Sequence, residues 1–87
     1  MAELLDNDQA IAEYLSQVLE DGDVDELLRA LGHVAKARGM TQVAEAAGLG
    51  RQNLYKVLAP GAGPKFDTVL RVFHALGLGL RVQAVHS

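Results

Sequence analysis

The chain has no cysteine and no tryptophan, and only two prolines among its 87 residues. Without cysteine it can build neither a disulfide framework nor a thiolate metal site. Because proline is scarce and 49% of the residues are hydrophobic, disorder throughout the chain is excluded. No apolar run approaches the roughly 20 residues that span a bilayer, and the first residues are acidic where a secretion signal would be basic. These absences predict one soluble, cytoplasmic domain.

Residue types that catalysis and metal binding need are also sparse. The two serines have no visible base nearby in the sequence, so no nucleophile is indicated. The stretch 61–65 contains two glycines and a lysine, but no strand precedes it and no GK[ST] motif follows, so a phosphate loop is not indicated. The histidines are too scattered to suggest a metal site: His33, His74 and His86. We expect no enzyme activity, no cofactor and no metal.

Positive charge is missing from the first 28 residues. They contain nine Asp and Glu and no Lys or Arg, which gives a charge of −9. From residue 29 onward, eight Lys and Arg are opposed by two acids, which gives +6. Polyanion binding depends on the local field rather than on the total of −3. DNA is therefore a compatible partner for the basic part of the chain.

Apolar residues at helical spacing predict five helices. They lie within the ranges 1–22, 23–38, 41–47, 51–58 and 66–76. Glycines close them, and Pro60 and Pro64 make 59–64 a loop. The stripes expected to face the core are Ile11, Tyr14, Leu15, Val18 and Leu19; Val24, Leu27, Leu28, Leu31, Val34 and Ala35; and Phe66, Val69, Leu70, Phe73 and Leu76.

Polar residues stand where helices are expected to begin. Asp6 with Gln9, and Asp23 with Glu26, have capping-box spacing. The hydroxyl of Thr41 is expected to cap the third helix by accepting an unpaired amide of its first turn.

The C-terminal segment 78–87 alternates apolar and polar residues, which predicts a short β-strand. A single strand cannot satisfy its own backbone, so we expect it to pair with the same strand of a second chain in a two-fold dimer. The alternative is a frayed extended tail.

Residues 40–59, MTQVAEAAGLGRQNLYKVLA, have the pattern of a helix-turn-helix. Ala44 is small enough for two helices to cross, and Gly48 allows a left-handed turn. Core-facing anchors are expected at Val43, Ala47, Leu49, Leu54 and Val57. The alternative is an ordinary helical hairpin with solvated polar residues.

The polar residues left outside suit base reading. Arg51 can contact guanine with two hydrogen bonds, and Gln52 can do the same to adenine. Tyr55 offers a ring to a thymine methyl or a hydroxyl to a phosphate. Lys56 suits a phosphate, and Thr41 and Gln42 begin the preceding helix, where they can grip the DNA backbone.

Two segments together, ARGMTQVAEAAGLGRQNLYKVL and GAGPKFDTVLRVFHALGLGLRV, resemble the Xre-type addiction-module antidote proteins, which are HigA-like antitoxins. The resemblance covers nearly the whole chain, and the closing segment is its most specific part. It implies a dimer that binds palindromic operator DNA, represses its own operon and binds a small basic toxin. Carried onto this sequence, the DNA-binding residues are Thr41, Gln42, Arg51, Gln52, Asn53, Tyr55 and Lys56. One departure is Gly50, where many relatives carry a capping serine.

The acids of residues 1–28 admit two interpretations. They form a solvated helix face, or they attract a basic partner such as a toxin while repelling DNA from that side. Tyr14 is expected in the core rather than at a contact.

The predicted fold is an all-α, five-helix, lambda-repressor-like helix-turn-helix domain with a short C-terminal strand. Its expected parts are an acidic N-terminal helix at 1–22, the DNA-binding domain at 23–77 and a dimerising strand or tail at 78–87. The predicted function is a DNA-binding antitoxin. The alternatives are an orphan transcriptional regulator without a toxin, or a protein-interaction adaptor that does not read DNA.

Overall fold

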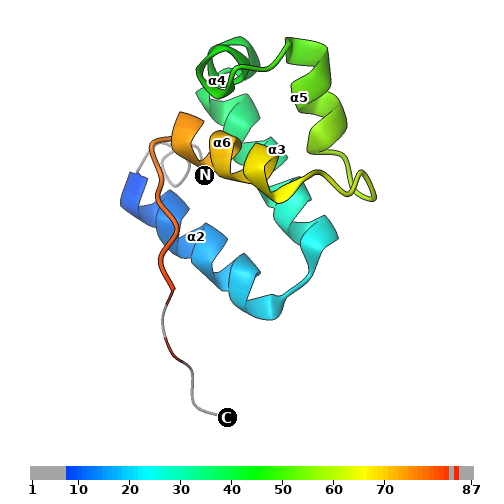
Figure 1. Cartoon of the computed structure of the whole chain (residues 1–87). Helices are drawn as coiled ribbons and strands as arrows, with labels where there is room; N and C mark the ends of the chain where they lie inside the picture. Colours follow the sequence, from blue (N-terminus) through cyan, green and yellow to red (C-terminus); the bar gives the residue numbers. More distant parts are fainter. Residues whose placement is uncertain (1–7, 83, 85–87) are drawn as a thin grey trace.

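The computed structural model describes residues 8–82 and 84, and all regular structure in this part of the chain is helical. The five helices are α2 (Asp8–Asp21), α3 (Val24–Arg38), α4 (Met40–Ala47), α5 (Arg51–Val57) and α6 (Phe66–Ala75). Figure 1 shows α2 and α3 joined as a hairpin, with α4 and α5 at the far end of the molecule and α6 crossing in front of α3. The predicted all-α class with five helices is confirmed.

The boundaries of α3 follow from its sequence. Asp23 precedes the helix in an extended conformation, and its carboxylate accepts a hydrogen bond from the backbone N–H of Glu26 at 3.2 Å. At the other end, the N–H of Gly39 donates to the carbonyl of Ala35 at 2.8 Å. The bases of the last turn lie near the negative end of the helix dipole. This predicted start and stop are therefore confirmed.

The predicted start of α4 is wrong by one residue. The helix begins at Met40, so Gly39 occupies the capping position and Thr41 lies inside the first turn. The cause is the backbone of Gly39, whose φ of 110° lets the chain turn from α3 directly into α4. Asp6, the other half of the cap predicted with Gln9, lies outside the described residues.

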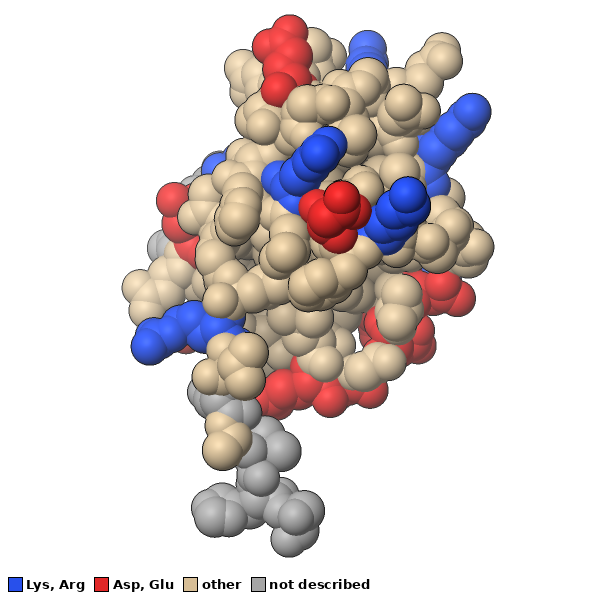
Figure 2. Space-filling model, in the orientation of Figure 1, with Lys and Arg blue, Asp and Glu red and all other residues tan. Residues whose placement is uncertain are grey.

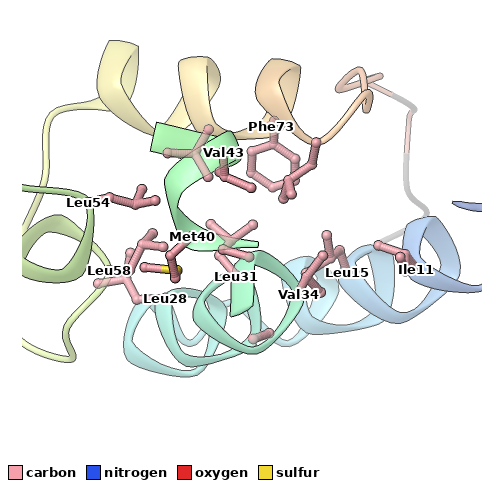
Figure 3. Close-up of a cluster of buried hydrophobic side chains, with 14 of the residues drawn as sticks. Ile11, Leu15, Leu28, Leu31, Val34, Met40, Val43, Leu54, Leu58 and Phe73 are labelled. Atoms are coloured by element: carbon pink, nitrogen blue, oxygen red, sulfur yellow. The ribbon is translucent and has the colours of Figure 1, made fainter. Parts of the chain in front are cut away.

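The core draws side chains from all five helices. Figure 3 shows Leu15 of α2, Leu31 and Val34 of α3, Val43 of α4 and Phe73 of α6 converging on one cluster. The largest fully buried side chains are Ile11, Leu15, Leu28, Leu31, Leu54, Leu76, Val34 and Val72.

Several residues predicted for the core are exposed instead. They are Tyr14, Leu19, Val24 and Phe66. Val24 and Phe66 are the first residues of their helices, where a side chain extends past the neighbouring helix. Tyr14 and Leu19 lie at the edges of the apolar stripe of α2, and only its centre, from Ile11 through Leu15 to Val18, is buried.

The predicted C-terminal strand is not seen. Residues 78–82 and 84 form no strand, and the described part of the chain offers no other strand with which they could pair. The backbone N–H of Leu78 instead donates to the carbonyl of Phe73, at 2.9 Å, and its side chain packs against the core. The tail then passes beside α2 (Figure 1), where Leu80 shares a groove with Leu15 and Leu19.

The loop between α5 and α6 is attached to the start of α3. The N–H of Gly61 donates to the Oδ1 atom of Asp25 at a distance of 2.8 Å. This bond links residues 36 positions apart and fixes the loop that follows α5. Among the described helices, none is both long and apolar enough to cross a membrane.

Candidate nucleic-acid interface

Helices α4 and α5 are joined by a tight turn at residues 48–50. Gly48 is left-handed, with φ 73° and ψ 29°, and its N–H points back to the carbonyls of Ala44 and Glu45. The N–H of Leu49 also bonds to the carbonyl of Ala44, at 2.8 Å. Ala44 itself is buried. The predicted roles of Ala44 in the crossing and of Gly48 in the turn are confirmed.

Replacing Gly48 with alanine is expected to lower the free energy of unfolding by about 1–2 kcal/mol, because a Cβ atom is strained in the left-handed region. Open space surrounds the position, so strain alone is being measured. The matched control is Gly32→Ala inside α3, where the added Cβ also meets nothing. That change is expected to stabilise by about 0.5–1 kcal/mol. Urea denaturation measures both, and equal effects at the two positions would contradict the argument.

The anchors of α5 lie as expected on its inner side. Leu54 is 0% exposed, and Leu49 and Val57 are half-buried against the core. Val43 and Ala47 of α4 are buried. Since Leu54 fixes which face of α5 points inward, the remaining positions of this short helix are directed outward.

All seven residues predicted for DNA binding are exposed: Thr41, Gln42, Arg51, Gln52, Asn53, Tyr55 and Lys56. The guanidinium carbon of Arg51 lies 5.9 Å from the centre of the Tyr55 ring, which is the range of a cation–π contact. Gly50 precedes α5 and, lacking a side chain, makes no side-chain cap.

An open groove of about 460 Å³ unites four of these seven residues: Thr41, Gln42, Arg51 and Tyr55. The groove runs between the end of α3, the start of α4 and the outer face of α5. The other three, Gln52, Asn53 and Lys56, are exposed on α5 but do not line it.

Two residues of the groove were not among the predicted site residues. Lys36 and Arg38, in the last turn of α3, form the wall opposite α5. Sequence reasoning assigned them only to the helix dipole. The signal that could have found them is their position directly before the helix-turn-helix, since a chain that reverses at Gly39 returns α4 close to the end of α3.

The charges of the molecule are separated in space. Figure 2 shows Asp and Glu along the lower edge, over the connection between α2 and α3, and several Lys and Arg over the upper half. Three cations line the groove, and its described lining contains no acid. Arg38 also forms an ion pair with Asp8 of α2. The groove is therefore suited to an anionic ligand that also presents hydrogen-bonding edges.

Known proteins resemble this chain over nearly its full length. Residues 1–84 match a family model described as "Probable addiction module antidote protein". A protein of Haemophilus influenzae, described as uncharacterized, is 41% identical over 83 residues, which cover 95% of this chain and 86% of that protein. No solved structure matches the chain.

Proposed function

The chain belongs to the family of probable addiction module antidote proteins, and on that premise we propose that it is a DNA-binding antitoxin of the Xre-type, HigA-like kind. In this proposal it binds the operator of its own toxin–antitoxin operon through α5, represses that operon and neutralises a small basic toxin. The observation that supports DNA reading most directly is the outward face of α5, where polar residues surround the single buried anchor Leu54.

Each exposed side chain of α5 has a role in the proposal. Arg51 is positioned to donate two hydrogen bonds to guanine, and Gln52 exchanges a donor and an acceptor with adenine. The ring of Tyr55 lies beside the Arg51 guanidinium, which limits the orientations that Arg51 can adopt before DNA arrives. Lys56 contacts a phosphate and adds affinity without sequence preference.

A single α5 reads only a few base pairs, so we propose that two copies of the chain bind a palindromic operator. Two recognition helices in a symmetric dimer read half-sites about one helical turn, roughly 34–36 Å, apart. Protection of two symmetric half-sites in a footprint supports this arrangement, and protection of one isolated half-site contradicts it.

The deciding experiment is a gel shift with the DNA immediately upstream of the gene for this chain, compared with a scrambled duplex of equal length. The proposal expects tighter binding to the upstream DNA and a steep loss of affinity with salt, because counterions are released from phosphates. Equal binding to both duplexes, or none, contradicts a reader of operator DNA and favours an adaptor. Operator binding without capture of the adjacent gene's product indicates an orphan regulator.

The acidic side of the molecule is the proposed toxin-binding surface. Glu13 and Glu20 lie on α2 around the exposed Tyr14, which sits between two shallow depressions. The acids at the connection to α3 extend this charge away from α5: Asp21, Asp23, Asp25 and Glu26. A basic protein is electrostatically complementary to such a surface.

Replacing both Glu13 and Glu20 with lysine is expected to weaken capture of the adjacent gene's product roughly tenfold, because two attractive charges become repulsive. Operator binding should not weaken. Surface plasmon resonance at low and high salt measures capture, and the difference should shrink in high salt. The control is Glu45→Lys on α4, an equally exposed acid on the opposite side of the molecule. Unchanged capture by the double variant would assign these acids to solvation alone.

A further inference from the structure

The ion pair between Asp8 and Arg38 joins two elements that lie far apart in the sequence. Asp8 is the first residue of α2, and Arg38 is the last residue of α3. The Arg38 side chain is 31% exposed and that of Asp8 is 77% exposed. Because both groups reach water, this pair can open without leaving a buried charge behind.

Arg38 faces a second environment as well. It lines the groove together with Lys36 and Arg51, whose positive charges face the space beside Thr41 and Gln42. Asp8 does not line the groove, yet its carboxylate neutralises one of the three cations there. The groove is therefore less positive while the pair is closed than when it is open.

We infer that Lys36 and Arg38 contact the phosphate backbone of the bound DNA, and that Asp8 competes with a phosphate for Arg38. This inference rests on the proposed function, since it extends the DNA interface from α4 and α5 to the end of α3. Duplex DNA carries one negative charge per about 1.7 Å of axis, so a phosphate close to Lys36 lies within reach of its neighbour too.

The exchange of partners is physically favourable for Arg38. A phosphate accepts two parallel hydrogen bonds from a guanidinium, as a carboxylate does, and the released Asp8 is exposed enough to be solvated again. The counterions displaced from DNA add a gain in entropy that the carboxylate cannot offer. Asp8 thus lowers DNA affinity by an amount that its removal should restore.

The test measures binding of the full chain to the upstream duplex and to the scrambled duplex between 50 and 200 mM salt. Arg38→Gln should weaken binding to both duplexes by the same factor. Its affinity should also fall about 3.5-fold less across this salt range than that of the unmodified chain, which corresponds to one lost phosphate contact. Equal salt dependence of the two proteins would overturn the phosphate contact.

Asp8→Asn should raise affinity for both duplexes by about two- to fivefold, the range expected when an exposed ion pair no longer competes. In the Arg38→Gln background the same change should have no effect, because the two residues act on one contact. Unchanged or lower affinity for Asp8→Asn alone would overturn the competition.

Two controls separate these effects from others. Arg81→Gln removes the same charge from the exposed tail beside α2 and should leave the salt dependence nearly unchanged. Thermal melting confirms that each variant is folded. If the unmodified chain binds neither duplex, the proposed function fails and this inference falls with it; if it binds and only the Arg38 and Asp8 results fail, the proposed function stands.

Discussion

Leu54→Ala is expected to lower the free energy of unfolding by about 2–5 kcal/mol and to remove operator binding together with it. Leu54 is 0% exposed and is the buried residue of α5. Its truncation leaves a cavity between α5 and the core cluster, and a seven-residue helix has no stability of its own. Chemical denaturation measures the loss, and a gel shift at low temperature, where the variant remains folded, measures the effect on binding.

The matched control is Leu19→Ala on α2. Leu19 is 41% exposed, so its truncation removes less buried area and leaves no closed cavity. We expect the loss at Leu19 to stay within about 1 kcal/mol, as for most surface changes. Similar losses for the two leucines would show that α5 is not held by its single anchor.

Arg51→Ala and Gln52→Ala are each expected to weaken binding to the upstream duplex by about 1–3 kcal/mol while leaving binding to the scrambled duplex nearly unchanged. Each truncation leaves base-edge groups without a partner, and that loss occurs only on the correct sequence. Titrations of both duplexes at one salt concentration give the ratio of affinities. Arg51→Lys should not restore the lost affinity, because an ammonium group cannot reproduce the two parallel hydrogen bonds of a guanidinium.

Lys56→Ala provides the contrast within the same helix. As a phosphate contact, Lys56 should contribute equally on both duplexes, and its removal should reduce the slope of log affinity against log salt by about one. If Arg51→Ala and Gln52→Ala show this same uniform loss, the two residues are phosphate contacts and the assignment of base reading to them is wrong.

Local chemistry made much of the fold predictable from the sequence. The cap of Asp23 on Glu26 and the left-handed turn at Gly48 each depend on residues only a few positions apart. The spacing of apolar residues then located the helices, and the ends of α5 and α6 differ from prediction by a single residue. The exposed positions of the α5 face followed from one buried position, Leu54.

What sequence reasoning missed depends on neighbours that local patterns do not specify. Periodicity identifies an apolar stripe, but the angle at which α2 meets α3 decides that Val18 is buried and Tyr14 is not. Lys36 and Arg38 became groove residues only through the turn at Gly39. The strand at the C-terminus was inferred from alternation alone, and alternation without a pairing edge does not make a strand.

The hydrogen bond from Gly61 to Asp25 has a consequence for how closely α5 can discriminate between sequences. It fixes the loop after α5, while the turn at Gly48 fixes the residues before it, so the helix is held at both ends. A reader held in this way loses little conformational entropy when it binds. It also has little freedom to tilt toward a mismatched base pair, so the cost of a mismatch stays in the contact itself instead of being relieved by movement of the helix.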